Sequence, residues 1–288
     1  MKIIVPVLLA LLWTAPVAGA EFDPAPIEAV AAAYAGVQPG LERYQAVIET
    51  DRIAEILKEM TAGIPPDLPR PTPPTLILSW SRATGETTIA AAHPQPFPTM
   101  EEMIRHFSRK FALDMPGLFL PRRGAEERRR LLKAAEVKVT ESQLAATRSM
   151  TISATFRDPV ALNGAFYHPA LSLPQQGIIS LSMDLDTTEK VLRRLEVGTA
   201  SGQRLTAEMR HLPCRDGSLL NEVLITSPDG QIDDRLKITF AEVNGFLLPA
   251  RQERNSRRPE GEERTTVTFV GHRVNPPQTA SPAQGEPR

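Results

Sequence analysis

The sequence predicts an α+β protein in which one large, strongly curved antiparallel sheet, an unclosed half-barrel, is covered on its concave face by helices. Three observations lead to this fold class. From Gly177 onward, seven runs of strand length follow one another, joined mostly by short turns. Each run has one apolar face and one polar face, and the chain before residue 140 carries helical patterns. Strands connected in this way pair with their sequence neighbours as a meander.

Turn residues with specific backbone requirements separate the seven runs. Asn244-Gly245 is a strong hairpin signal, because both central residues of the tight turn need a positive φ. Pro249 lies in the run that follows, where its missing N–H favours an edge strand or a bulge. The other turns lie at Asp186-Thr187, 198–203, Asp216-Gly217, Pro228-Asp229-Gly230 and 257–262.

Alternation along the runs indicates that only one face of the sheet is covered. In the run 235–243, Leu236, Ile238 and Phe240 share one face, and the run 264–272 follows the same rule. Antiparallel sheets covered on one side show this pattern. In the first run, Ile179, Leu181, Met183 and Leu185 alternate with Ser180, Ser182 and Asp184.

Helical and strand patterns alternate before the meander. Asp23-Pro24 is typical of a helix start, and this helix is expected to reach about Tyr34. The region 41–60 mixes two periods, so periodicity alone leaves strand and helix open there. Its strand-like positions are Tyr44, Ala46 and Ile48, and its helix-like positions are Ile53, Ile56, Leu57 and Met60.

Three further patterns complete the first half of the chain. The proline-rich stretch 64–74 fits neither a helix nor a central strand, and it predicts an extended surface connection. Two apolar runs within 75–92 flank Thr84-Gly85 and predict a hairpin. The β-branched runs 136–142 and 149–157 predict two more strands.

The region 99–111 has the clearest helical stripe. Thr99 and Glu102 form a capping-box pattern, and a second helix is expected at about 125–135. Methionine and phenylalanine make an adaptable surface that suits acyl chains, although most apolar stripes are simply buried in a core. The stripe consists of Met100, Met103, Ile104, Phe107 and Phe111.

The two ends are expected to lie outside the fold. Residues 1–20 have a basic start, an apolar run and small residues up to Ala20, which is typical of a signal peptide cleaved after Ala20. The protein is therefore expected in the periplasm, and no later segment approaches membrane-spanning length. Residues 21–275 are expected to form a single domain, and the proline-rich tail 276–288 is expected to be disordered.

Composition narrows the class of partner. The net charge of −1 argues against a general nucleic-acid binder. The basic cluster 122–133 contains Glu126 and Glu127, and a solvated helix face explains it better than a patch for an anionic partner. Cys214 is the single cysteine, so stability must come from a hydrophobic core and not from an internal disulfide.

Catalytic and metal-binding patterns are missing from the sequence. The five histidines lack metal-ligand spacing, and no nucleophile elbow, phosphate loop or dinucleotide fingerprint occurs. His211 and Cys214 could form a nucleophilic pair, but a strand end beside an Asp-Gly turn is a shallow site. Asp184 and Asp186 are explained by the turn that they precede. We therefore expect neither catalysis nor a cofactor or metal.

Three segments of the meander resemble a known superfamily: "SMDLDTTEKVLRRLEV", "PDGQIDDRLKITFAEVNGFLLPARQE" and "TVTFVGHRVN". Together with the order of elements over about 25–275, they resemble the periplasmic lipoprotein carriers LolA and LolB, with RseB-type sigma-factor regulators and LppX-type proteins as relatives. The resemblance implies a half-barrel capped by helices, with acyl chains held in the cavity between them. It assigns no ligand-contacting residue, because the buried arginine of the carriers matches no position clearly.

These observations favour a non-enzymatic carrier that binds a lipid or an acylated protein. The stripe helix would be its lid, and Trp80 would form a second wall. The alternative is a sensor or adaptor that binds another envelope protein, and a third, weaker hypothesis is a hydrolase. A carrier predicts an apolar tunnel, an adaptor predicts a filled core with an exposed apolar patch, and an enzyme predicts clustered polar groups with perturbed pKa values.

Overall fold

The computed structural model describes residues 22–63, 72–95, 98–113, 116–144, 147–259 and 261–276. The expected signal peptide, most of the expected tail and residues 64–71 of the proline-rich stretch lie outside these residues. Within the described ranges the protein has four α-helices, one short 3-10 helix and twelve strands. None of these helices has the length and apolar character needed to cross a membrane.

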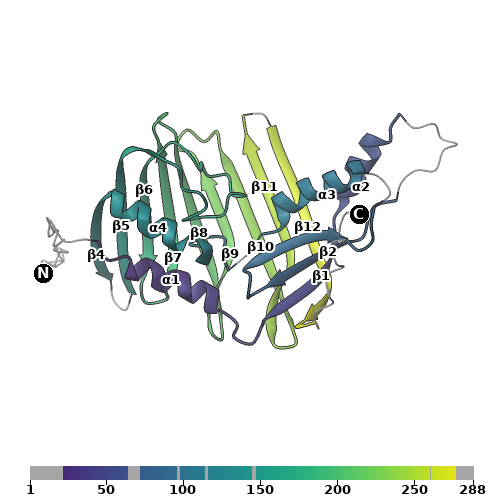
Figure 1. Ribbon diagram of the computed structural model, residues 1–288, viewed down its shortest axis with the longest axis horizontal. Coiled ribbons are helices and arrows are strands. Elements are labelled where there is room, and N and C mark those ends of the chain that lie inside the picture. Colours follow the sequence, from purple (N-terminus) through teal and green to yellow (C-terminus); the bar gives the residue numbers. More distant parts are fainter. Residues whose placement is uncertain are drawn as a thin grey trace, which may run out of the picture.

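The twelve strands form one antiparallel sheet, which confirms the predicted fold class. Their order is β3-β2-β1-β12-β11-β10-β9-β8-β7-β6-β5-β4, so β3 and β4 are the two edges and the sheet stays open. Figure 1 shows the sheet running from β4 at one end to β1 and β2 at the other. The strands are β1 (Arg43–Glu49), β2 (Leu76–Ser81), β3 (Glu86–Ala91), β4 (Glu136–Leu144), β5 (Thr147–Val160), β6 (Ile178–Asp186), β7 (Val191–Thr199), β8 (Arg204–Cys214), β9 (Gly217–Thr226), β10 (Asp233–Val243), β11 (Phe246–Arg258) and β12 (Gly261–Val274).

The seven predicted runs are the strands β6 to β12, and each pairs with its sequence neighbour. Asn244 and Gly245 have φ values of 51° and 81°, as the predicted tight turn requires. Thr239 pairs with Arg251 and Phe240 with Pro249, so β11 carries a bulge beside the proline. The bulge is confirmed, whereas the edge-strand alternative is wrong, because β11 lies between β10 and β12.

The alternation of buried and exposed side chains holds along most of β6 and fails at the first two residues of the strand. Leu181, Met183 and Leu185 are buried as predicted, but Ile179 is 36% exposed and Ile178 is buried instead. The pairing of β6 with β7 shifts between Ile178 and Ser180. Such an irregularity moves the preceding side chain to the opposite face. The predicted inward position of Ile179 is therefore wrong.

The helices are α1 (Ala25–Gly36), α2 (Asp51–Met60), α3 (Pro98–Phe111) and α4 (Ala125–Ala134), with the 3-10 helix η1 (Arg122–Gly124) before α4. The ambiguous region 41–60 contains both alternatives in turn, since β1 ends at Glu49 and Thr50 caps α2 by accepting from the Arg52 N–H at 3.4 Å. Helix α3 begins at Pro98, so Thr99 lies inside the helix and the predicted capping box is not its start.

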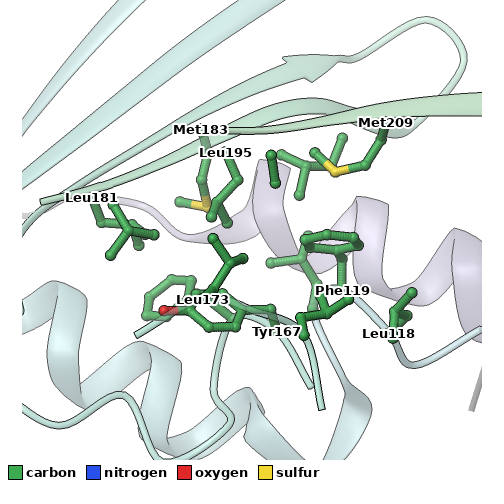
Figure 2. Packing of buried hydrophobic residues seen from close by; sticks show 14 of the residues in the cluster. Leu118, Phe119, Tyr167, Leu173, Leu181, Met183, Leu195 and Met209 are labelled. Carbon is green, nitrogen blue, oxygen red and sulfur yellow. The ribbon is translucent and has the colours of Figure 1, made fainter. Parts of the chain in front are cut away.

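Two hydrophobic cores lie under the sheet. The first core joins α1, α4 and the segments 118–120 and 162–173 to the strands β5–β10. The second core joins α2 and α3 to β1–β3, β11 and β12. In Figure 1, α1 and α4 cross the strands β5–β9, while α3 lies at the β12 end. Figure 2 shows Leu118, Phe119, Tyr167 and Leu173 packed against Leu181, Met183, Leu195 and Met209, so side chains fill the first core.

An arginine holds the helical layer of the first core together. Arg128 on α4 is 0% exposed, and its Nε and Nη2 donate to the two carboxylate oxygens of Glu28 on α1 at 3.0 and 2.9 Å. Its Nη1 donates to the carbonyl oxygens of Ala165 at 2.6 Å and Pro121 at 3.3 Å. The solvated-face hypothesis for 122–133 therefore holds for Arg130, which pairs with Glu127, and is wrong for Arg128.

We expect Arg128→Ala to destabilise the protein by about 3–5 kcal/mol, because it leaves the Glu28 carboxylate and two carbonyl groups without their cation. The matched control is Arg129→Ala, at the exposed neighbouring position, which should cost less than about 0.5 kcal/mol. Urea denaturation monitored by circular dichroism gives both values. Equal losses in the two variants would contradict the structural role of Arg128.

Candidate functional site

All six residues predicted to line the ligand cavity lie in the second core. Trp80 on β2 stacks on Tyr44 with ring centroids 5.5 Å apart, and Phe107 contacts Phe111 on α3 with centroids 4.5 Å apart. The structure therefore brings the stripe and Trp80 together, as part of a packed core. Met103 is half-buried, and the other five are buried: Trp80, Met100, Ile104, Phe107 and Phe111.

A groove of about 1100 Å³ borders the second core between α3, the end of β3 and the segment 168–170. Its walls are the end of β3 with residues 92–95, the α3 residues between Glu101 and Ala112, and the segment 168–170. We call it the α3 groove. Among the six predicted residues, Ile104 lines it. The Oγ of Ser108, on the same wall, accepts a hydrogen bond from the Ile89 N–H at 3.3 Å and so ties α3 to β3.

Small and apolar side chains form much of the α3 groove, and charged ones stand at its rim. Ala91, Ala112 and Ala170 are half-buried there. Arg105 and Arg109 are exposed on α3, four residues apart, and therefore lie on the same face of the helix. Glu101 on α3 also lines the groove, so the two arginines leave one net positive charge there. The groove can accept an apolar chain along its floor and an anionic group beside the arginines.

A neighbouring cavity of about 560 Å³ surrounds the β2–β3 turn and shares Thr87, Ala112 and His168 with the α3 groove. Trp80 borders this cavity. Arg82 in the turn donates to four carbonyl oxygens at the end of α1 and just after it, at 2.6–2.9 Å. These bonds attach the β2–β3 hairpin of the second core to α1 of the first core. The accepting carbonyls are those of Ala35, Val37, Gln38 and Leu41.

His168 lies where the two cavities meet. Its Nδ1 accepts a hydrogen bond from the Ala170 N–H at 3.1 Å. Burial lowers the pKa of His168 below its ordinary value, because the protein replaces the water that would solvate the imidazolium. A neutral imidazole therefore borders the groove at pH 7. Sequence reasoning missed His168, Ser108 and the alanines, since no motif or periodicity marks them.

His211, one member of the nucleophilic pair His211 and Cys214 considered above, makes contacts that stabilise the fold. The Nε2 of His211 lies 3.0 Å from the Tyr34 hydroxyl, which also accepts from the Leu192 N–H at 2.8 Å. The imidazole tautomer sets which of Tyr34 and His211 donates, and the two rings stack with centroids 5.8 Å apart. Burial, with a smaller contribution from the Arg193 charge, lowers the pKa of His211 to about 4. Cys214 is a half-buried free cysteine at the end of β8.

The paired carboxylates of β6 also serve the fold. Asp186 accepts from the backbone N–H groups of Thr188 and Glu189 at 3.1 and 3.0 Å, which is the turn role expected of it. Asp184 accepts from the Thr151 hydroxyl at 2.7 Å. In the part of the chain that the structure describes, no group of three or more His, Cys, Asp or Glu side chains is arranged to hold a metal ion.

His211 should make stability depend on pH. Unfolded histidine takes up its proton near pH 6.5 and folded His211 only near pH 4, so stability falls as the pH drops from about 6.5 to about 4. The full loss is of the order of 3 kcal/mol. His211→Gln should flatten this part of a stability–pH curve measured by urea denaturation, and the exposed control His93→Gln should not. Identical curves for all three proteins would contradict the buried neutral histidine.

Comparisons with known proteins give structural matches alone. No family model and no curated protein matches the sequence. An outer membrane lipoprotein-sorting protein domain from Vibrio parahaemolyticus is 8% identical, with a TM-score of 0.34 over 87% of this chain and 92% of that one. A LolA superfamily protein from Nitrosomonas europaea is 9% identical, with a TM-score of 0.28 over 86% and 93%. A chain of the MucA/MucB complex from Pseudomonas aeruginosa is 12% identical, with a TM-score of 0.26 over 85% and 92%. Solved structures from the superfamily that the sequence resembles are thus among the matches, at a similarity that carries no information on ligand or activity.

Proposed function

We propose that this protein is an exported, periplasmic, non-enzymatic carrier that binds a lipidic group with its acyl chain in the α3 groove. The observation that carries the proposal is an open groove of about 1100 Å³ beside two cores that are already filled. Small-molecule sites usually enclose about 300–1,000 Å³. The groove therefore offers room for a chain without displacing the packed side chains of either core.

The place of the ligand differs from the one suggested by the resemblance. An acyl chain between the helices and the sheet would have to displace residues such as Phe119, Tyr167 and Met183, which are buried against one another (Figure 2). Burying apolar surface contributes about 25 cal/mol per Å², and these side chains have already gained it. A ligand in the α3 groove, between α3, β3 and the segment 168–170, gains apolar contact without that loss.

The chemistry of the groove fits an amphiphile. Ile89, Ile104 and the half-buried alanines supply apolar contact, and each buried methylene of a chain contributes about 0.8 kcal/mol. Arg105 and Arg109 stand at the rim, where a guanidinium pairs well with a carboxylate or phosphate. In this proposal Trp80, Met100, Met103, Phe107 and Phe111 hold α3 in place and Ile104 touches the ligand.

The alternative is an envelope adaptor that binds another protein, and the filled first core favours it. An adaptor would also need an exposed apolar patch. Among the described residues the exposed large hydrophobic side chains are Val139 on β4, Ile179 on β6 and Leu212 on β8, so at least one other strand separates any two of them. This scattered distribution favours the carrier over the adaptor.

We expect Ala91→Trp to weaken the uptake of a fluorescent fatty acid by roughly tenfold or more, because the indole would take the place of at least two chain methylenes. The control Ala200→Trp makes the same substitution in the exposed loop after β7 and should bind like the unmodified protein. Circular dichroism and thermal melting establish that both variants are folded. Ala91 is a better position than Phe107 for this test, because replacing Phe107 would damage the second core.

Two outcomes would count against the carrier. In the first, the protein is purified from periplasm without detergent, mass spectrometry of its organic extract finds no lipid, and the protein then takes up no added fatty acid. The other is uptake that Ala91→Trp leaves unchanged, which would move the ligand away from the α3 groove.

A further inference from the structure

A separate polar cavity of about 700 Å³ lies at the ends of several central strands. One wall is Ser172, Leu173 and Pro174, from the same segment whose residues 168–170 border the α3 groove. The other walls are residues 202–205 at the start of β8, the β9–β10 turn, and Arg258 and Pro259 at the end of β11 and just after it. We call this cavity the Arg258 pocket. Its lining is more polar than that of the α3 groove, so it suits a different kind of ligand.

A buried network fixes the wall beside Arg258. Arg254 on β11 forms an ion pair with Asp234 on β10 at 2.7 Å, and the two side chains are 8% and 3% exposed. Arg254 also donates to the Ser172 Oγ at 3.0 Å and to the Ala170 carbonyl oxygen at 3.3 Å. The Ser172 hydroxyl donates to Asp234 in turn. Buried charges of this kind persist only when they are paired and hydrogen-bonded.

Arg258 is held by the same network. It lies four residues after Arg254 and so on the same face of β11. Its Nη2 donates to the Ser172 Oγ at 2.7 Å, so this oxygen accepts from two guanidinium groups while its proton goes to Asp234. A guanidinium has five N–H donors in a planar fork, and this bond uses one of them. Arg258 is therefore oriented before any ligand arrives.

The pocket has an excess of positive charge. Arg204 stands at the start of β8 on another wall, and Asp229 is the carboxylate among the bordering residues. A hydrogen bond from the Ser227 hydroxyl, helped by one from the Gln231 N–H, lowers the pKa of Asp229 and engages it within its own turn. Two guanidinium groups thus face one carboxylate that already has donors. Charge-assisted bidentate contacts to arginine are typical of phosphate recognition.

We propose that the Arg258 pocket binds a phosphate group carried by a small polar molecule, with Arg258 and Arg204 as its two cationic contacts. The volume exceeds what the phosphate alone would fill, and Pro174, Ile232 and Pro259 provide apolar contact for the carbon part of the ligand. A sugar phosphate and a phospholipid headgroup share this chemistry. The site is distinct from the α3 groove and does not depend on acyl-chain binding.

Isothermal titration calorimetry with glucose 6-phosphate tests the soluble source, and flotation with phosphatidylcholine vesicles, with and without phosphatidic acid, tests the lipid source. We expect saturable binding of one probe that Arg258→Gln and Arg204→Gln each weaken by roughly tenfold, as for the loss of one charge-assisted contact. Arg194→Gln, on the exposed outer side of β7 and paired with Glu196, is the matched control and should bind normally.

Binding of glucose 6-phosphate that depends on both arginines supports a soluble ligand, and binding of phosphatidic acid vesicles with the same dependence supports a headgroup. The proposal is overturned if neither probe binds saturably, or if Arg258→Gln and Arg204→Gln both bind as the unmodified protein does. Fatty-acid uptake by Arg258→Gln should equal that of the unmodified protein. This readout separates a failure of the Arg258 pocket from a failure of the α3 groove.

Discussion

The helical layer of this protein depends on one guanidinium that folding removes from water. Arg128 joins α4 to α1 through Glu28 and to the 162–173 segment through the Ala165 carbonyl. A charge buried this completely is costly unless every donor finds a partner, so the three elements must assemble together. The approach is so close that a Cβ on Gly124 would lie 2.7 Å from the Ala165 Cα. The filled first core follows from this arrangement.

A second buried arginine marks the boundary between the two cores. Inward-facing positions of β11 and β12 are polar at Gln252, Arg254, Ser256 and Thr265, although all four are buried. An apolar side chain gains little next to such a strip, because the polar groups need partners of their own. The strip therefore divides the concave face. The segment 168–174 crosses it, held by Arg254, and contributes to both the α3 groove and the Arg258 pocket.

Much of the fold was predictable because strand periodicity and turn chemistry are local. Asn244-Gly245 identified a hairpin, and alternation in β10 and β12 identified their buried faces. The inward placement of Ile179 failed because a register shift depends on the partner strand β7, which the alternation of β6 does not report. The burial of Arg128 was hidden for a similar reason, since its partner Glu28 lies a hundred residues earlier.

The candidate sites were less predictable than the fold. The structure places the stripe of α3 and Trp80 in one core, as apolar periodicity favours burial, and their part in ligand binding stays a prediction. The α3 groove is made of alanines, Ser108 and His168 from three distant segments. Such residues have no pattern of their own, and tertiary structure alone brings them into one place.

The position of β1 beside β12 affects how the chain folds. Tyr44 pairs with Val274 and Ile48 with Phe269, so one of the first strands to be synthesised finds its partner in the last. Strands β4 to β11 can assemble as successive hairpins, whereas β1 must close a loop of more than two hundred residues, and contacts of such long range form slowly. Until then β1 and β12 expose unpaired edges, which are prone to association with other chains. The second core and the α3 groove are therefore the last parts of the molecule to be completed, since both need β1 and its neighbours in place.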